Sequence, residues 1–369
     1  MNLAALIAFL LSASHLATVM GNSLAQFGPP TRRYLGAEIL PEKIVSQNEY
    51  TEYDIKFETE VANHATRYSP VQLKDGQYTS SMSVRLGNSD IGAEFTGQDY
   101  DTLLTYIAQT QQGGSPSMQS VTQLTSWVDV RINRALIERN EVDRWKAITD
   151  AMVPIRGDGG YKEDVQLANP AGHRVPAGGA WSTAGYAIYN DISAMVTFLR
   201  DKGYVISRII AGRPVISKLL MNTDLKTRAG RVTVSPTGQI QSVAAGIMTL
   251  ADINSILSTD NLPPITEYNL TYKMQGNVSG YFLRRDAMVF VCETGRDGEF
   301  RDAQDAPSVI PNVLGYTGIG RPAGRQSAGR AVVLTPYENK PPRIEAEGWQ
   351  TSFPVIQDPE AIGVIYSIA

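Results

Sequence analysis

Hydrophobic residues recur at helical spacing over an unusually long stretch, residues 116–152. Steps of three, four or seven connect the apolar positions Val121, Leu124, Val128, Ile132, Ala135, Val142, Trp145, Ile148 and Met152. This stripe predicts an amphipathic helix, with Ser115 as its N-cap and Pro116 in its first turn. We expect Pro154 to end it. About 37 residues at 1.5 Å each would span roughly 55 Å, which indicates a spine helix on which other elements are laid.

Charged residues on the same helix form two pairs at supporting spacings. Arg134 precedes Glu138 by four positions, and Glu141 precedes Arg144 by three. Such pairs stabilise a helix modestly when they lie on its exposed face. We therefore expect both pairs on the solvent-facing side.

Alternating polar and apolar positions before the spine predict two strands. Tyr53, Ile55 and Phe57 alternate with charged residues, and the same period of two recurs from Tyr78 to Leu86. Together they indicate an extended β-hairpin over residues 46–86. Its far end lacks the apolar residues of a local core, so we expect it either to move in solvent or to lie on another molecule.

The first charged residue of the chain is Arg32. An apolar run from Leu3 to Leu11 and the small-residue sequence Ser23-Leu24-Ala25 permit a secretory signal over residues 1–25. However, no Lys or Arg precedes the apolar run, which is also too short to span a bilayer. With Met1 retained, we favour an N-terminal arm, residues 1–45, whose apolar face is buried between subunits.

The remaining pattern mixes helices and strands and predicts an α+β fold. Residues 156–179 read as a hairpin or loop. We expect helices at 183–202, ending at Gly203, and at 213–221 and 250–257. We expect strands at 205–211, 267–273, 287–292, 349–356 and 362–368, the last two separated by the turn Asp358-Pro359-Glu360.

Composition narrows the possible functions. The chain has 33 basic and 37 acidic residues, a net charge of −4, which argues against a dedicated nucleic-acid binder. An apolar content of 43% argues against disorder. Cys292 is the only cysteine, so no intrachain disulfide can form, and its place at the end of an apolar strand predicts a small packed side chain.

No motif predicts catalysis, a cofactor or a metal. The three histidines are far apart, and no phosphate-binding loop, nucleophile elbow or zinc-protease motif occurs. The Gly318–Gly324 segment departs from a dinucleotide-binding loop, and the acidic residues between Asp297 and Asp305 miss the spacing of a calcium loop. We therefore expect no catalytic, cofactor-binding or metal-binding residues, and a protein that is not an enzyme.

One basic run stands out among glycines: Arg321, Arg325 and Arg330. These guanidinium groups could contact phosphates or carboxylates of a neighbouring subunit. An exposed flexible loop is the alternative interpretation.

The order of elements resembles the major capsid proteins of tailed bacteriophages, which share the Hong Kong 97 fold. Within that group the chain is similar to the lambda-type capsid protein E family. The resemblance rests on the C-terminal residues 348–369, with a closing strand, an Asp-Pro turn and a last apolar strand, and on residues 134–150, which look like the family's spine. The uncharged arm and the Gly/Arg-rich loop depart from that pattern.

The resemblance implies a structural protein whose copies form hexamers and pentamers of an icosahedral shell. It implies portal, scaffold and decoration proteins as partners, enclosed DNA without sequence-specific binding, no membrane, and location in the virion after synthesis in the host cytoplasm. The expected division is a hairpin loop at 46–86, a peripheral domain at 87–203 and 337–369, and an axial domain at 204–336. The residues expected at contacts between subunits are Phe27, Arg32, Arg67, Lys74, Asp75, Arg321 and Arg325. The alternative is an exported periplasmic binding protein or hydrolase.

Overall fold

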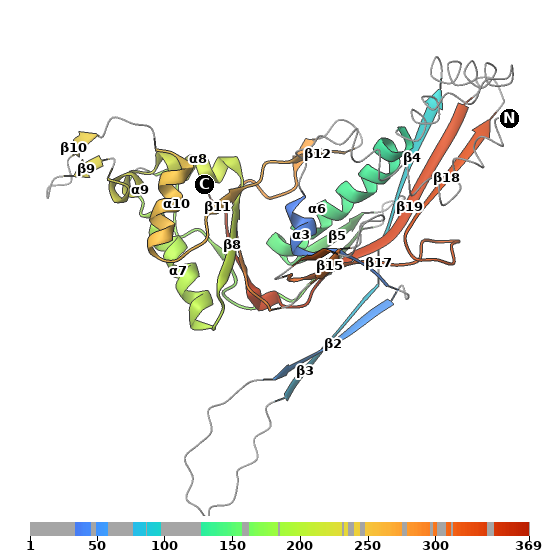
Figure 1. Ribbon diagram of the computed structural model, residues 1–369, viewed down its shortest axis with the longest axis horizontal. Helices are drawn as coiled ribbons and strands as arrows, with labels where there is room; N and C mark the ends of the chain where they lie inside the picture. Colours follow the sequence, from blue (N-terminus) through green and yellow to red (C-terminus); the bar gives the residue numbers. More distant parts are fainter. Residues whose placement is uncertain are drawn as a thin grey trace, which may run out of the picture.

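The computed structural model shows an elongated molecule with one hairpin projecting from its body (Figure 1). Two five-stranded sheets carry most of the structure, and both contribute buried apolar residues to one core. The residues described are 34–45, 49–57, 77–85, 87–96, 127–156, 162–183, 185–230, 232–234, 240–243, 248–274, 279–295, 298–300, 308–310, 313–337 and 343–368.

The first sheet is built around one long strand, β19. Gly348 of β19 is paired with Ile91 on one side and with Val332 on the other, so β4 and β18 flank it. β17 continues the β18 side, and β1 pairs with β17 in parallel. The strands are β1 (Glu42–Ile44), β4 (Gly87–Thr96), β17 (Gly315–Ile319), β18 (Arg330–Tyr337) and β19 (Arg343–Ile356).

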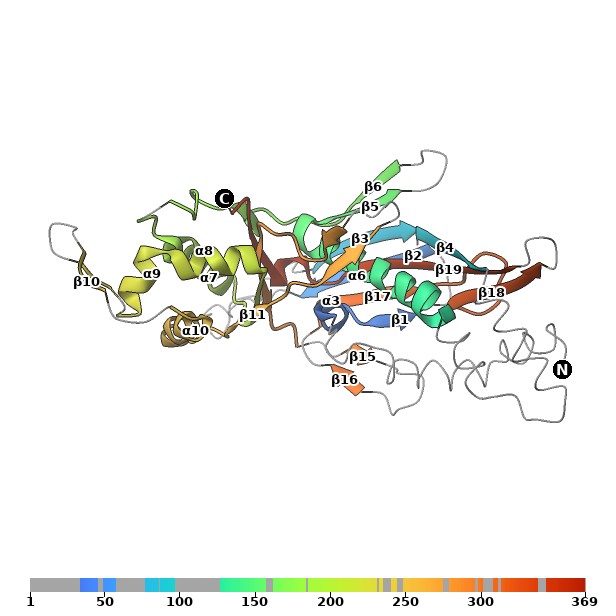
Figure 2. The ribbon, with the colours of Figure 1, turned by 90° about the horizontal axis from the view of Figure 1, so that it is seen from above.

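A long helix, α6 (Arg134–Asp150), lies along this sheet (Figure 2). One π-helical turn, η1 (Asp129–Asn133), precedes it. The end predicted at residue 152 is two residues late, and Pro154 is not what ends the helix. Ala151 adopts a left-handed conformation with φ of 49°, and β5 (Met152–Arg156) begins directly after it. Residues 116–126 of the predicted spine lie outside the described residues.

The buried face of η1 and α6 carries both apolar and charged side chains. Ile132, Trp145 and Ile148 are fully buried, as the stripe predicts. The prediction for Glu141 and Arg144 was wrong, because neither side chain is exposed. Glu141 precedes Trp145 by four residues and Ile148 by seven, so its position on the helix is on the same face.

The second sheet has the order β11-β8-β14-β20-β7. Its central strand is completely buried, and β20 is covered by the first of four helices that gather at this end (Figure 1). The strands are β7 (Arg174–Pro176), β8 (Ile206–Ala211), β11 (Ile265–Glu267), β14 (Met288–Cys292) and β20 (Ile362–Tyr366). The helices are α7 (Ile188–Asp201), α8 (Arg213–Met221), α9 (Thr223–Arg228) and α10 (Leu250–Thr259).

Local signals account for most of these elements. Gly203 follows α7 with φ of 86°, as predicted for its C-terminal cap. Thr249 and Asp252 form a capping box that starts α10. The strand predicted at 267–273 is instead split, because β11 ends at Glu267 and β12 (Thr271–Lys273) pairs with β13 (Ser279–Tyr281).

The projecting hairpin consists of β2 (Glu49–Phe57) and β3 (Gln77–Arg85), paired in antiparallel register as predicted (Figure 1). Within the described part of the chain, neither strand pairs with a third. The polar stretch between them lies outside the described residues. A second hairpin joins β5 to β6 (Lys162–Gln166), which agrees with the hairpin or loop predicted there. Two shorter ones are β9 (Val232–Val234) with β10 (Ile240–Val243), and β15 (Gly298–Phe300) with β16 (Ser308–Ile310).

The N-terminal segment that is described packs against the chain's own body. Helix α3 (Leu35–Ile39) contacts α6, and Leu40 is fully buried. Part of the predicted arm of residues 1–45 is therefore internal to the subunit, whereas residues 1–33 lie outside the described residues. At the other end, the 3₁₀ turn η3 (Pro359–Ala361) carries the chain from β19 of the first sheet to β20 of the second.

Candidate functional site

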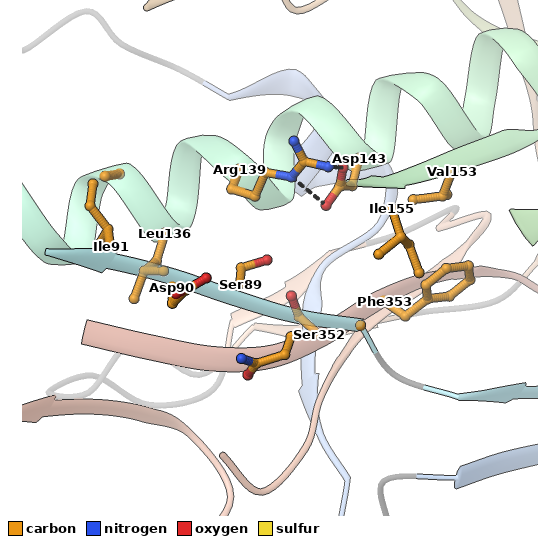
Figure 3. Close-up of a pocket in the computed structure, with 13 residues that line it drawn as sticks. Ser89, Asp90, Ile91, Leu136, Arg139, Asp143, Val153, Ile155, Ser352 and Phe353 are labelled. Atoms are coloured by element: carbon orange, nitrogen blue, oxygen red, sulfur yellow. Dashed lines mark hydrogen bonds and ion pairs between the residues drawn. The ribbon is translucent and has the colours of Figure 1, made fainter. Parts of the chain in front are cut away.

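A pocket of about 210 Å³ opens between α6, β4, β5 and β19 (Figure 3). Asp143 reaches it from α6, and its Oδ2 accepts a hydrogen bond from Nε of Arg139 at 3.2 Å. Nη2 of Arg139 also donates to the backbone oxygen of Pro154 on β5, at 3.2 Å. Burial raises the pKa of Asp143 to about 6, and the neighbouring Arg139 only partly offsets that rise.

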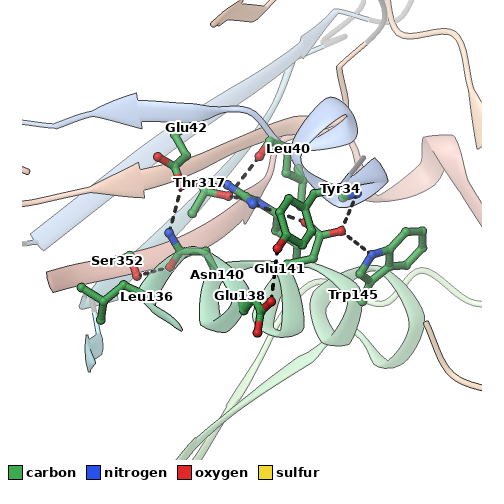
Figure 4. A network of polar contacts seen from close by, with 12 residues as sticks. Tyr34, Leu40, Glu42, Leu136, Glu138, Asn140, Glu141, Trp145, Thr317 and Ser352 are labelled. Carbon is green, nitrogen blue, oxygen red and sulfur yellow. Dashed lines mark hydrogen bonds and ion pairs between the residues drawn. The ribbon is translucent and has the colours of Figure 1, made fainter. Parts of the chain in front are cut away.

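On the opposite side of α6, Glu141 is the centre of a buried polar network (Figure 4). Its Oε1 accepts hydrogen bonds from the backbone N–H of Gly36 at 2.8 Å, from Nε1 of Trp145 at 2.8 Å and from Oη of Tyr268 at 2.7 Å. Burial, together with the Glu141 carboxylate, raises the pKa of Tyr268. One carboxylate thus connects α3, α6 and the segment after β11.

Arg144 extends this network to the first sheet. Its Nη1 lies 3.4 Å from Oε2 of Glu141, and its Nη2 lies 3.3 Å from Oε1 of Glu42 on β1. Its Nε donates to Oγ1 of Thr317 on β17 at 2.8 Å, and that hydroxyl donates to the backbone oxygen of Leu40 at 3.1 Å. Each of the three guanidinium nitrogens of the buried Arg144 therefore has an oxygen partner.

Asn140 joins β1 to β19. Its Nδ2 donates to Oε1 of Glu42 at 3.1 Å, while its Oδ1 accepts from Nε2 of Gln350 at 2.7 Å and from Oγ of Ser352 at 2.8 Å (Figure 4). Gln350 is completely buried. The side-chain amide thus bridges the N-terminal segment and the central strand of the first sheet.

Glu42 faces a second cation, Arg330 of β18, whose Nη2 lies 2.6 Å from its Oε1. Burial alone would raise the pKa of Glu42, but Arg330, Arg144 and the amide of Asn140 hold it below its usual value. Arg330 also donates to Oε1 of Gln350 at 3.0 Å. Arg330, one of the three arginines of the basic run, therefore lies on a strand and is paired within its own chain.

We call the six residues Glu42, Asn140, Glu141, Arg144, Thr317 and Arg330 the anchor network. Its two carboxylates balance two guanidinium groups, which limits the cost of burying charge. Gly36 fits closely against it, since a Cβ there would lie 2.8 Å from the Glu141 oxygens. The network holds residues 36–42 at three points on α6 and the sheet, so its role is to fix where the N-terminal segment enters the body.

The two other arginines of the basic run are exposed and lie in one loop between β17 and β18. The guanidinium of Arg325 lies 5.7 Å from the ring centre of Trp349. Nε1 of Trp349 donates to the backbone oxygen of Ala323 at 3.0 Å, which fastens the loop that carries Arg321. The remaining predicted contact residues lie outside the described residues: Phe27, Arg32, Arg67, Lys74 and Asp75.

The described residues contain no cluster of three His, Cys, Asp or Glu side chains that could hold a metal ion. Cys292 is fully buried in β14, and burial raises the pKa of its thiol to about 12. Among the helices in these parts of the chain, none is both long and apolar enough to cross a membrane.

Known proteins resemble this chain in structure. No protein-family model and no curated protein matches its sequence. The structure is similar to a phage-related protein from Bordetella bronchiseptica RB50, with a TM-score of 0.52 and 12% identity over 96% of each chain. It is also similar to a protein assigned as the capsid protein of a prophage of Escherichia coli CFT073, with a TM-score of 0.50 and 15% identity over 79% of each chain.

The chain therefore has the α+β fold of the Hong Kong 97 phage capsid proteins, as the order of its elements predicts. The narrower likeness to the lambda-type family stays a prediction. The exported binding protein or hydrolase that the apolar N-terminus left open gains no support from these comparisons.

Sequence reasoning missed both the anchor network and the Asp143 pocket. A partial signal existed for Glu141, which is in phase with Trp145 and Ile148 on the apolar stripe. A carboxylate at such a position is either paired in the interior or absent from a stable fold. Its partners Gly36 and Tyr268 carry no comparable signal, because a glycine in a short helix and a tyrosine beside a strand are both common.

Proposed function

We propose that this chain is a major capsid protein, many copies of which assemble into an icosahedral shell that encloses phage DNA. The observation that carries the proposal is the fold shared with the prophage capsid protein over 79% of both chains. Because the two are only 15% identical, the function comes from this analogy and from the physical features below.

The projecting hairpin supports assembly on independent grounds. Each of its strands has nine residues, and together they form a two-stranded sheet joined to no other described strand. An isolated two-stranded hairpin is marginally stable in water, whereas packing against another surface stabilises it. In a shell, the neighbouring subunit supplies that surface. We therefore propose that residues 46–86 lie on a neighbour, with contacts near Arg67, Lys74 and Asp75.

The N-terminal arm and the basic loop are further proposed contacts. The anchor network fixes the position of residues 36–42, and the uncharged residues before Arg32, Phe27 among them, suit an apolar neighbour, while Arg32 suits a carboxylate at the same contact. Arg321 and Arg325 are exposed cations suited to carboxylates of the next subunit. Contacts of this head-to-tail kind close into rings when the rotation between subunits is right, which gives hexamers and pentamers.

The two sheets suggest how the subunit is arranged in such a ring. β17 and β18 pair with β19, although the sequence pattern predicted that all of residues 204–336 belong to an axial domain. We propose that the sheet along α6, built around β19, is the peripheral part. The sheet around β14, with its four helices, then forms the axial part near the symmetry axes. In this division, β20 of residues 362–366 belongs to the axial sheet.

The remaining partners follow from the proposed role. A closed shell with a DNA entrance needs a portal, and scaffold and decoration proteins would guide and reinforce it. A net charge of −4 keeps the shell from binding DNA tightly, since affinity for DNA follows basic contacts to phosphate. The chain would be made in the host cytoplasm and end in the virion, and no enzymatic activity is proposed for it.

Assembly of the full chain tests this proposal. The chain is expressed alone and with candidate scaffold proteins from the same genome, and then examined by sedimentation velocity and electron microscopy. We expect closed shells with five-fold and six-fold capsomers. A chain that stays monomeric in every combination of salt, pH and scaffold would contradict the proposal.

Deletion of residues 1–28 tests the arm separately. We expect a folded monomer with an unchanged circular dichroism spectrum, because the anchor network begins only after Tyr34, and we expect much poorer shell formation. A matched control replaces residues 2–28 by a Gly/Ser segment of equal length. Shells formed by the deletion at the wild-type yield would show that the arm is dispensable.

A further inference from the structure

One carboxylate oxygen in the pocket of Figure 3 has an incomplete set of partners. Oδ1 of Asp143 is buried and accepts no hydrogen bond from the described residues. It forms an ion pair with Nη2 of Arg139 at 2.9 Å, without the geometry of a hydrogen bond, and the same nitrogen also donates to the backbone oxygen of Pro154. The oxygen can therefore accept a hydrogen bond from a further donor. The whole Asp143 residue is only 8% exposed, so bulk water solvates the oxygen poorly.

The walls of this pocket are of two kinds. Apolar side chains from β4, α6, β5 and β19 line one part: Ile91, Leu136, Val153, Ile155 and Phe353. Polar side chains line the other: Asn88, Ser89, Asp90, Arg139, Asp143 and Ser352. A ligand that fits both parts has a polar head and an apolar stem, as lysine and arginine side chains do.

We propose that this pocket binds an organic cation, an alkylammonium or guanidinium group on an apolar stem, with Oδ1 of Asp143 accepting its hydrogen bond. The head would donate to this oxygen, which has an ion pair but no hydrogen bond, and the stem would lie on Ile155 and Phe353. A guanidinium can also stack on the planar group of Arg139, which a metal ion cannot do.

The charges around Asp143 agree with this assignment. Arg139 and Arg144 on α6 favour its ionised form, while burial disfavours that form more strongly, so that its pKa is raised. Asp90 on β4 adds a second carboxylate at the rim. β5 and β19 contribute no charged side chain to the lining. The pocket thus holds two carboxylates against the single lining cation Arg139, and one further cation would balance it.

The cation could be a side chain of a neighbouring copy or a free amine. The first source rests on the proposed shell function, whereas the second does not. Equilibrium dialysis distinguishes them, because a neighbour's side chain occupies the pocket only in assembled shells.

The test measures binding of labelled agmatine, which carries a guanidinium, and of butylamine to the unassembled full chain. We expect the dissociation constant of both probes to rise about tenfold from pH 8 to pH 5, as a carboxyl with a pKa of about 6 becomes protonated. Asp143→Asn should abolish binding at every pH. Asp224→Asn changes a half-buried carboxylate on α9 that, like Asp143, is paired with an arginine four residues away, and as the matched control it should bind like the wild type. Equal urea midpoints for both variants would establish that folding is retained.

Binding to shells then identifies the source. Shells that exclude agmatine while the unassembled chain binds it indicate a neighbour's basic side chain, and shells that bind it equally indicate a free amine. Asp143→Asn that binds both probes like the wild type would overturn the proposal, as would a wild-type chain that binds neither. Failure of the shell proposal would appear differently, as absence of shells in the wild type.

Discussion

Different interactions stabilise each of the two sheets of this molecule. The sheet around β14 is covered by helices, and its central strand has five buried residues, none of them charged. The sheet along α6 instead contacts two ion pairs of the anchor network, of which Glu141 with Arg144 is buried and Glu42 with Arg330 is partly exposed. Apolar burial stabilises without direction, whereas hydrogen-bonded charges permit few alternative arrangements. The difference indicates that the sheet around β14 contributes mainly folding stability, whereas the sheet along α6 fixes the position of the N-terminal segment.

The N-terminal segment shows why position needs directional bonds. α3 is only five residues long, and although Leu35 and Ile39 are buried in the core, apolar burial has no direction and fixes the register of so short a helix on α6 only weakly. A buried ion pair adds little net stability compared with well-packed apolar residues. We infer that the anchor network fixes the register of α3 on α6. Substitutions in the two sheets should therefore differ both in how much stability they remove and in which part of the molecule they affect.

The largest effect is expected in the apolar sheet. Phe290→Ala in β14 removes a fully buried ring and should lower the free energy of unfolding by about 3 to 5 kcal/mol. Urea unfolding measures the loss. Hydrogen exchange should still show α3 protected under native conditions. Loss of α3 protection ahead of global unfolding would contradict the distinction between the two sheets.

Glu141→Gln should cost less but act locally. The change removes the charge that faces Arg144 while keeping the size of the side chain, and hydrogen bonds to charged groups contribute about 1.5 to 3 kcal/mol. Hydrogen exchange should show faster opening of α3, with β14 unchanged. Glu347→Gln, an exposed position on β19, is the control. Equal destabilisation of both sheets would show that the network is not a local device.

Gly36→Ala should produce a smaller loss at the same place. The added methyl group would meet the Glu141 oxygens at 2.8 Å, and overpacking of this kind costs about 1 to 3 kcal/mol. Alanine regains about 0.5 to 1 kcal/mol over glycine in a helix. We expect a net loss near 1 kcal/mol, measured by urea unfolding. A more stable variant would mean that α3 moves away from α6 without cost.

The last expected effect is a pH dependence from Asp143, which changes stability only between about pH 4 and pH 6. Its pKa is raised from 3.8 to about 6 in the folded chain, so between these values the unfolded chain releases the proton first. Stability should therefore fall as pH rises from about 4 to 6 and then level off, with a slope below about 1.4 kcal/mol per pH unit for one proton. Asp143→Asn should remove this component from a series of urea midpoints. An identical pH profile in that variant would exclude Asp143 as its source.

Sequence patterns predicted the elements better than the contacts. The period of the apolar stripe gave the position of α6 along the chain, and the glycine after α7 gave its end. Pro154 misled, because the left-handed Ala151 had already turned the chain into a strand that accepts a proline. The partners of Glu141 could not be predicted, since Gly36 and Tyr268 lie 105 and 127 positions away from it.

The path of residues 343–366 has a consequence for synthesis. These residues supply first the central strand of one sheet and then, after one 3₁₀ turn, an internal strand of the other. A nascent chain that has not yet passed Arg343 on the ribosome lacks β19, and one stopped at Ile356 still lacks β20. Neither sheet can close before this stretch has left the ribosomal tunnel. Prematurely terminated chains are therefore excluded from any assembly that recognises the finished fold.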